Sequence, residues 1–318
     1  MVRRGSLQYW HRRRAAKPLP RIRSAPQTEG VSISDILAFK AGMTHLIMAG
    51  DEGRFKNMET SRACTILEVP HTEVYGVRLY SVDASTRYKK SYMELYNKQA
   101  ALKVGIKNVK LTEEKIEAAK SDQKVTDVSL LIAAYPKDTS HVQNHQSRYE
   151  ARLSGNSVKE KLEFAAKMLG QELKPGMVFK NGQYVDVFAV SKGKGWQGPV
   201  KRFGISRNLH KATGKSRHVG TLGPANPSDV LYTVPRAGQM GYHYRFDHNK
   251  RVLKIGTKEE TEAINVSGGF KNYGVVRSDY IVVDGSVPGP AKREVRVRHS
   301  LSYAKAQPQE PKITYIAK

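Results

Sequence analysis

Most of the excess positive charge of this chain lies in two segments that contain too few apolar residues to build a core. Residues 1–23 hold eight Lys and Arg and no acid, and residues 192–254 hold thirteen Lys and Arg with two acids. These 86 residues carry 19 of the 25 net positive charges of the 318-residue chain. Charge gathered in this way indicates a polyanionic partner, and phosphate backbones are the abundant polyanions; anionic membranes are the alternative.

The first of these segments predicts an extended arm over residues 1–30. Pro18, Pro20 and Pro26 disfavour a helix and bias the backbone toward extended conformations. The arginines of the segment present planar guanidinium groups, which bind phosphate through two parallel hydrogen bonds. We therefore expect the arm to contact a nucleic-acid backbone.

The remaining composition excludes several classes of protein. With 39% hydrophobic residues the chain is too apolar for full disorder, and no apolar stretch approaches the roughly 18 residues of a membrane-spanning helix. The cationic start of the chain lacks the apolar segment of a secretion signal. Cys64 is the only cysteine, which excludes an internal disulfide framework and a multi-cysteine zinc site. We expect a cytoplasmic protein with no membrane contact.

Short apolar runs rich in β-branched and aromatic residues predict strands on both sides of a helical segment. Two runs precede it, at residues 36–49 and 62–82. After it, an Asn-Gly pair at 181 and 182 predicts a two-residue hairpin within residues 177–190. Further strands are predicted at Asp229–Val234, Lys250–Ile255, Asp279–Asp284 and Glu294–Val297. We predict a mainly β fold in which residues 31–95 and 175–318 form one β domain with a C-terminal tail.

Residues 96–174 predict an inserted α/β subdomain. Residues 111–122 predict a helix capped by Thr112, residues 125–136 a buried strand, and Val158–Leu169 a second helix. The segment holds fourteen basic and ten acidic residues, so its charge is nearly balanced. This balance is typical of an ordinary globular insertion rather than of a nucleic-acid interface.

A second segment without a core lies at residues 204–227. It contains four glycines, two prolines and four Lys and Arg, with few large aliphatic side chains. A structureless loop of this length inside a compact domain is usually functional or disordered. We predict a finger that becomes ordered within folded RNA; the alternative is a flexible, solvated surface loop.

Three glycines at 193, 195 and 198 match the letters of a dinucleotide-binding motif but not its context. Pro199 follows directly and the next acid is Asp229, whereas the motif opens a helix and needs an acid about 20 residues on. The loop instead offers lysine and arginine side chains for phosphate and an indole for stacking on a base. The alternative for Trp196 is a plug in the mouth of a barrel.

The sequence predicts no catalytic residue, metal site, cofactor or small-molecule substrate. Gly214-Lys215-Ser216 lacks the upstream glycine of a phosphate-binding loop, because residue 209 is Leu. His71-Thr72-Glu73 matches a deaminase fragment, but that zinc site needs two further cysteines. The histidines at 210, 218, 243 and 248 are interpreted as RNA contacts or packing residues.

Several stretches resemble one known family along nearly the whole chain. They are RRGSLQYWHRRRA and PRIRS in the arm, FKAGMTH at 39–45, KGKGWQGPVKRFG, PRAGQMGYHYRFDHNKRVLKIG at 235–256, GGFKNYG at 268–274 and DGSVPGPAKREVRVR at 284–298. In these stretches the chain resembles the universal large-subunit ribosomal protein three family, in its archaeal and eukaryotic form. Residues 96–174 resemble it less distinctly.

The resemblance implies a translation-factor-like β-barrel with an α/β insertion, an extended N-terminal arm and a long central finger. The arm and finger are expected to penetrate the large-subunit rRNA, with the finger at about residues 204–234 approaching the peptidyl transferase centre. The family joins early in subunit assembly, beside neighbouring ribosomal proteins and near the factor-binding RNA loop. The implied finger tip is Gly223, Pro224, Ala225, Asn226 and Pro227.

One residue of the tip departs from the family pattern. Many relatives carry Trp where this chain has Ala225, so gating of aminoacyl-tRNA entry by stacking is not expected here. Asn226 still offers hydrogen-bonding groups to RNA.

The residues expected to bind RNA come from the arm, the finger and the base of the finger. They are Arg3, Arg4, Arg12, Arg13, Arg14, Arg21, Arg23, Lys192, Lys194, Trp196, Lys201, Arg202, Arg207, His210, Lys211, Lys215, Arg217, His218, Asn226, Arg236, Gln239, Tyr242, His243, Arg245 and Lys250. For Tyr242 the alternative is a cap over the barrel.

The predicted function is that of a non-enzymatic structural constituent of the large ribosomal subunit. Its expected partners are large-subunit rRNA and neighbouring ribosomal proteins. The alternatives are an rRNA-modifying enzyme, which would need a cofactor pocket or catalytic residues, and another basic nucleic-acid-binding protein.

Overall fold

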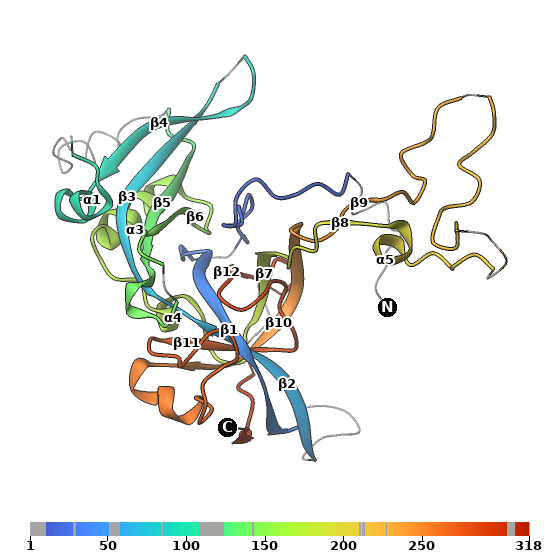
Figure 1. The fold of residues 1–318 in the computed structure, drawn as a ribbon. Coiled ribbons are helices and arrows are strands. Elements are labelled where there is room, and N and C mark those ends of the chain that lie inside the picture. Colours follow the sequence, from blue (N-terminus) through green and yellow to red (C-terminus); the bar gives the residue numbers. More distant parts are fainter. Residues whose placement is uncertain are drawn as a thin grey trace. The chain divides into compact units, whose positions relative to one another are not determined.

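The structure is a computed structural model that describes residues 11–27, 30–50, 58–83, 85–107, 124–141, 143–209, 211, 214–226, 228–303 and 309–317. The described chain is mainly β, as the sequence predicts (Figure 1). It divides into two compact units, a smaller one formed by residues 1–18 and 190–245 and a larger one formed by residues 19–189 and 246–318. The helix expected at residues 111–122 lies outside the described residues.

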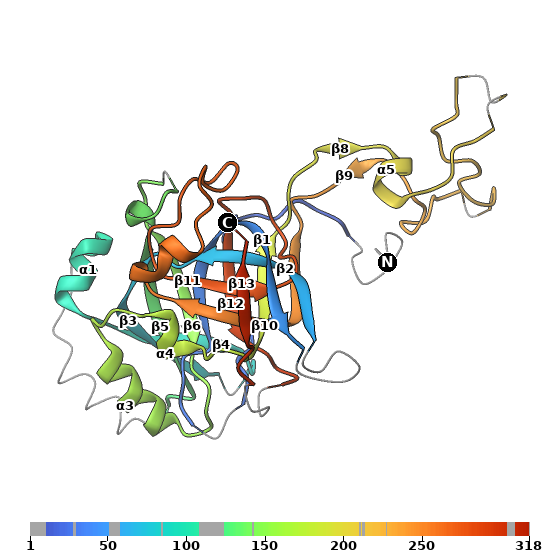
Figure 2. The same cartoon turned by 90° about the horizontal axis from the view of Figure 1, so that it is seen from below.

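A seven-stranded sheet forms much of the larger unit (Figure 2). Its strands lie in the order β12 (Glu294–His299), β7 (Tyr184–Val190), β10 (Tyr244–Gly256), β11 (Tyr280–Asp284), β2 (Glu59–Glu68), β1 (Asp35–Ala49) and β13 (Ile313–Ile316). The first residues of β1 also pair antiparallel with β12, so the pairings lead from β12 round to β1 and back to β12. Strands predicted at 36–49, 62–82, 250–255, 279–284 and 294–297 are confirmed.

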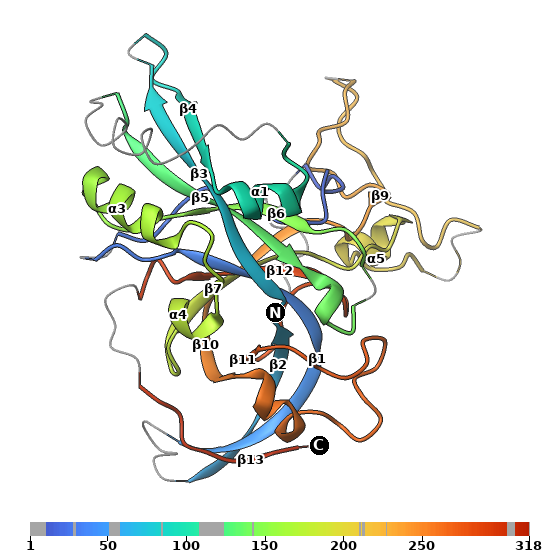
Figure 3. The ribbon, with the colours of Figure 1, turned by 90° about the vertical axis from the view of Figure 1, so that its left-hand side faces the viewer.

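The larger unit also contains a four-stranded antiparallel sheet (Figure 3). Its strands lie in the order β4 (Lys89–Tyr96), β3 (His71–Val82), β5 (Asp127–Tyr135) and β6 (Ser147–Arg152). β5 is buried on both faces, because Leu130 and Ile132 pack with α3 (Val158–Met168) while Leu131 and Ala133 pack with α1 (Lys98–Val104). A continuous apolar run is typical of a strand buried on both faces. The predicted strand at 125–136 and the helix beginning at Val158 are confirmed.

The grouping of strands cuts across the boundary expected at residue 95. β3 and all but the last residue of β4 lie before residue 96, yet β3 pairs with β4 and β5 rather than with the seven-stranded sheet. The domain boundaries read from the sequence stay a prediction.

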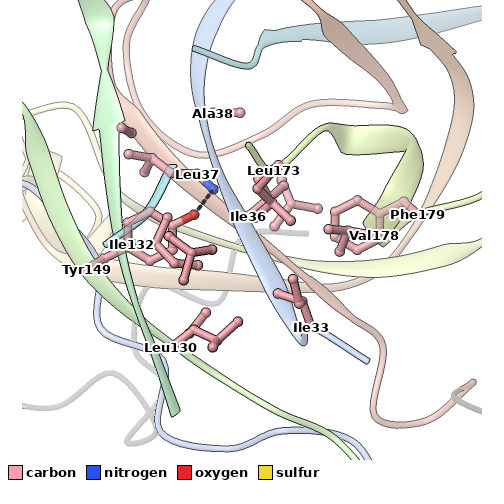
Figure 4. Close-up of a cluster of buried hydrophobic side chains, with 14 of the residues drawn as sticks. Ile33, Ile36, Leu37, Ala38, Leu130, Ile132, Tyr149, Leu173, Val178 and Phe179 are labelled. Carbon is pink, nitrogen blue, oxygen red and sulfur yellow. Dashed lines mark hydrogen bonds between the residues drawn. The ribbon is translucent and has the colours of Figure 1, made fainter. Parts of the chain in front are cut away.

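One hydrophobic core contains side chains from both sheets of the larger unit (Figure 4). Ile36 and Leu37 of β1 lie in it together with Leu130 and Ile132 of β5. The amide of Leu37 donates a hydrogen bond to the Tyr149 hydroxyl at 3.2 Å, which gives this buried phenol a partner (Figure 4).

The hairpin predicted at Asn181-Gly182 is wrong. The preceding run forms a short helical turn, α4 (Pro175–Val178), with proline at its first position, so only the following run becomes a strand, β7. Gly182 still adopts a left-handed backbone with φ of 80°, and its amide donates to Val252 O at 2.8 Å. The described part of the larger unit also contains two 3₁₀ turns, at Pro136–Asp138 and Lys258–Ala263.

Strand β12 buries three charged side chains on the face opposite to its valines. Arg296 donates through Nε to Asp35 at 2.8 Å and pairs with it a second time through NH2, while Arg298 pairs with Asp186 of β7. The side chains of both pairs are at most 3% exposed. A buried charge is tolerated only when it is paired and hydrogen-bonded, so these contacts fix β12 against β1 and β7.

The same arginines bind the backbone of the second half of the arm. Arg296 donates to Pro20 O at 3.3 Å, and Arg298 donates to the Ser24 hydroxyl at 2.6 Å. Pro20 and Ile22 are buried while Arg21 and Arg23 are exposed. The arm expected at residues 1–30 is therefore divided, because residues from 19 on are part of the larger unit.

Replacing Asp186 with Ala is expected to lower the free energy of unfolding by about 3–5 kcal/mol, because Arg298 would keep a buried charge without its carboxylate. Denaturant unfolding measures the loss. Glu260→Ala is the matched control, because it removes the half-exposed partner of Lys254 and should change stability by at most about 1 kcal/mol. Equal effects of the two substitutions would contradict the role given to the buried pair.

His299 gives the larger unit a distinct dependence on pH. Burial lowers the pKa of its imidazole to about 4, and the Gln183 amide donates to its Nδ1 at 2.8 Å. The unfolded chain binds a proton near the ordinary pKa of 6.5 whereas the folded chain does not, so stability is complete above pH 6.5 and falls as the pH drops toward 4.

Between pH 6.5 and 4 we expect this histidine to remove about 3 kcal/mol of stability. Denaturant unfolding at a series of pH values measures the slope, and His299→Gln should flatten it over that interval. Parallel curves for the two proteins would show that His299 does not titrate with folding.

Candidate nucleic-acid interface

The smaller unit concentrates positive charge more strongly than any other part of the chain. Its residues 1–18 and 190–245 contain sixteen Lys and Arg and one acid, Asp229. Its elements are short: β8 (Trp196–Gln197), α5 (Pro199–Phe203) and β9 (Gly238–Gln239), seen together in Figure 2. Like charges repel, and the helix and strands of this unit are short, so other contacts must hold its segments together.

Two chain segments, residues 191–197 and 238–243, pair to form a stem. Trp196 lies opposite Gln239 in the β8–β9 ladder, and the ladder continues as Met240 N donates to Gly195 O at 2.9 Å. Gly241 has φ of 71°, and a Cβ there would lie 2.1 Å from Lys192 O. Only glycine fits this close approach of the two backbones.

The Arg202 side chain fastens α5 to the stem. Its guanidinium donates to Gln239 O at 3.1 Å and to Arg236 O at 3.0 Å. A Cβ on Gly238 would lie 2.8 Å from the same guanidinium, so the missing side chain makes room for it. Arg202 is thus held in place through backbone carbonyls, and its positive charge is not cancelled by these contacts.

The first half of the arm packs against this stem. Ala15 N donates to Tyr242 O at 2.8 Å, and His243 Nδ1 donates to Arg13 O at 2.9 Å. The Arg12 guanidinium donates to Arg202 O at 3.3 Å. The arm therefore brings further arginines to the place where Arg202 already lies.

An aromatic ring lies close to two of these cations. The guanidinium carbons of Arg12 and Arg202 lie 4.5 Å and 5.1 Å from the centroid of the Phe203 ring. Cation–π attraction to the ring offsets part of the repulsion between the two like charges. His11 stacks on Tyr232 with ring centroids 5.4 Å apart, which adds a second aromatic contact between arm and finger segment.

Burial and neighbouring like charges lower the pKa values of several groups in this cluster. Burial lowers the pKa of Arg12, and the charges of Arg202 and Arg245 lower it further. Burial also lowers the pKa of Arg202. The pKa of His243 falls because of burial and then because of Arg245, Arg12 and Arg202, although its bond to Arg13 O acts in the opposite direction. An anion placed here would relieve this repulsion.

A cavity of about 180 Å³ lies beside the cluster. Arg12, Arg202 and Arg236 line it together with the rings of Phe203 and Tyr232. Guanidinium groups and aromatic faces together are the groups that bind phosphate and stack on bases in RNA-binding proteins.

Residues 204–234 carry no helix or strand in the part that the structure describes, and Figure 1 shows them as a long loop beyond α5. The strand predicted at Asp229–Val234 is wrong, because no other strand pairs with its described residues. Leu209, Leu231 and Tyr232 are 84%, 64% and 64% exposed. The described part of this segment has no hydrophobic core of its own, so its backbone is supported by few contacts such as Asn208 N to Ser216 O at 2.9 Å.

The structure brings together the predicted RNA-binding residues at the base of the finger and separates others. Arg12, Arg202, Gln239, Tyr242, His243 and Arg245 gather at the stem. Other predicted contacts of the smaller unit are exposed: Arg13, Arg14, Lys192, Lys194, Trp196, Lys201, Arg207, Lys211, Lys215, Arg217, His218, Asn226 and Arg236. Arg21, Arg23 and Lys250 belong to the larger unit. Arg3, Arg4, His210 and Pro227 lie outside the described residues.

Trp196 is 77% exposed on β8, which excludes the alternative that it plugs a barrel. Two contacts of the cluster, Phe203 and His11, were not among the predicted site residues. An aromatic residue directly after Arg202 was the only signal for Phe203, and nothing in the sequence indicates that it meets an arginine 191 positions earlier.

Within the described ranges, no three His, Cys, Asp or Glu side chains are placed to hold a metal ion. None of the helices described here is long and apolar enough to cross a membrane.

Comparison with known proteins gives a consistent result. The family model for ribosomal protein L3 matches residues 1–318. The large ribosomal subunit protein uL3 of Methanothermobacter thermautotrophicus is 40% identical over 99% of this chain and 96% of its own length. The proteins of the same name from Methanopyrus kandleri and Methanococcus vannielii are 40% and 39% identical over 99% of this chain, covering 90% and 96% of their own lengths.

Replacing Gly241 with Ala is expected to loosen the arm from the stem, because the new Cβ would collide with Lys192 O. Hydrogen exchange at the amides of Ala15 and Tyr242 measures the effect, and we expect it to report about 1–3 kcal/mol less protection than in the control. The control is Gly195→Ala, where φ is 65° but nothing lies within 4 Å of the new Cβ. Equal protection in both variants would mean that the close approach at Gly241 does not hold the arm.

Proposed function

The chain belongs to the ribosomal protein L3 family over its whole length, and we propose that its smaller unit is the main surface by which it binds large-subunit rRNA. As a member of that family it is a structural constituent of the large ribosomal subunit and not an enzyme. It acts in the cytoplasm, where ribosomes translate.

One observation carries the RNA-binding proposal. The guanidinium carbons of Arg12 and Arg202 lie 4.5 Å and 5.1 Å from the Phe203 ring centroid and line one cavity with Arg236, in a unit whose sequence contains a single acid. Arginine stays protonated at neutral pH, so these side chains would attract an anion that binds beside them. RNA phosphates supply such anions in a row, and a guanidinium fork binds each of them through two hydrogen bonds.

The finger segment extends this surface. Its exposed, basic and glycine-containing backbone cannot bury enough apolar area to fold alone, so ordering it requires a partner. In the proposed function residues 204–234 order against rRNA near the peptidyl transferase centre, as the family implies. Ala225 offers no aromatic ring at the tip, so Asn226 is the tip residue that bonds to RNA.

The larger unit then serves as the platform on which this surface is built. We assign its main sheet to a β-barrel, and the pairing of β1 with both β12 and β2 supports that assignment. Early entry into the assembling subunit fits a protein whose platform folds on its own while its basic segments wait for RNA. Its partners are rRNA and neighbouring large-subunit proteins.

The proposal predicts which charges matter. Changing Arg12, Arg202 and Arg245 together to Gln should lower the slope of log affinity against log salt by about 0.7 to 0.9 for each lost phosphate contact. Binding of the full chain to large-subunit rRNA, measured over a range of KCl concentrations, gives the slope. The stem must stay folded, which thermal unfolding of the variant checks.

The matched control changes Lys159, Lys167 and Lys180 to Gln, which removes the same net charge from exposed positions of the larger unit. This variant should keep the slope of the unchanged protein. Equal slopes for both triple variants would overturn the assignment of the interface to the smaller unit. Equal affinity for duplex DNA at matched salt would favour the alternative, a general basic nucleic-acid-binding protein.

A further inference from the structure

The larger unit contains a basic cavity of about 410 Å³ that lies outside the stem and finger. Its lining includes Arg62 of β2, Lys250 and Arg251 of β10, and Tyr184 at the start of β7. Among the lining residues that the structure describes, Asp284 is the one acid. Two strands far apart in the sequence thus supply like charges to one cavity, and a third strand supplies an aromatic ring.

Two other cavities of this unit provide a comparison. The larger, of about 630 Å³, is lined by two lysines, Lys174 and Lys180, and two acids, Asp279 and Glu310. The other, of about 270 Å³, is lined by two lysines and three acids. Counted over described lining residues, the cavity beside Lys250 therefore differs from these two by its excess of basic over acidic side chains.

The three basic side chains of this cavity are held differently. Arg62 pairs with Asp284 at 3.2 Å, whereas Arg251 donates to Gln309 O at 2.7 Å. Lys250 Nζ lies beside Gly285, where a Cβ would come within 3.4 Å of it. Because Gly285 has no side chain, the ammonium group of Lys250 can lie close to the backbone of this turn.

A stacked pair of tyrosines, one of them exposed, lies next to these charges. Tyr184 lines the cavity and stacks on Tyr303, with ring centroids 4.8 Å apart and an angle of 29° between the rings. Tyr303 is 48% exposed. Such a pair gives a base one further ring to stack on, and stacking beside a basic groove is typical of sites for single-stranded RNA.

We propose that this cavity binds one unpaired nucleotide of large-subunit rRNA, with its phosphate on Lys250 and Arg251 and its base on Tyr303. The inference rests on the proposed function, because it takes the partner to be rRNA, and it adds a second contact surface on the platform itself. An acidic protein segment would be attracted by the same lysine, but its carboxylates would gain no stacking on the exposed ring of Tyr303.

The two halves of the site predict different changes in binding of the full chain to its large-subunit rRNA. Lys250→Gln should lower the slope of log affinity against log salt by about 0.7, the value for a contact to single-stranded RNA. Tyr303→Leu should weaken affinity at least about fivefold without changing the slope, because it removes stacking and no charge. Lys250→Arg and Tyr303→Phe should restore the slope and the affinity.

Lys180→Gln at the neutral cavity is the matched control and should change neither quantity. If Lys250→Gln and Tyr303→Leu also change neither, while the triple variant at the stem still lowers the slope, the cavity is not an RNA site and the proposed function stands. If the stem variant fails as well, the proposed function itself is wrong. Binding of a polyglutamate peptide that Lys250→Gln abolishes, with rRNA binding unchanged, would assign the cavity to an acidic protein segment instead.

Discussion

Two arginines buried on β12 hold the second half of the arm against the larger unit. Arg296 and Arg298 are neutralised by Asp35 and Asp186, and they use their remaining donors on the backbone around Pro20 and Ser24. The arm is therefore anchored in the larger unit from residue 19 onward. Among the described residues of the arm, those before residue 19 belong with the stem to the smaller unit, where carboxylates are almost absent from the sequence.

The two units use arginine in opposite ways. In the larger unit a buried guanidinium meets a carboxylate, so its charge is cancelled and the contact is structural. In the smaller unit Arg202 donates to backbone carbonyls and Arg12 lies over the Phe203 ring. These contacts fix the two side chains without cancelling their positive charges. A surface preorganised in this manner loses little conformational freedom when phosphate binds, because its side chains are already held.

The parts of the fold that the sequence predicts are those in which apolar patterning dominates, such as β1, β5 and α3. It misses β4 and β6, whose sequences KKSYMELY and SRYEAR are too polar to stand out, because their pairing with β3 and β5 decides their structure. The hairpin at Asn181 fails because Pro175 starts a helical turn. Charge counting identifies the segments that we propose to bind RNA, but the contact of Arg12 with Phe203 joins residues 191 positions apart, which no local pattern encodes.

The most direct test of the central claim is the distance between the guanidinium groups at the stem and the nearest phosphate oxygens, measured in an experimental structure of this chain within its large subunit. The account predicts that Arg12, Arg202 and Arg245 each lie within about 2.7–3.2 Å of a phosphate oxygen. If those three side chains instead face protein carboxylates or bulk solvent in the assembled subunit, the account is contradicted.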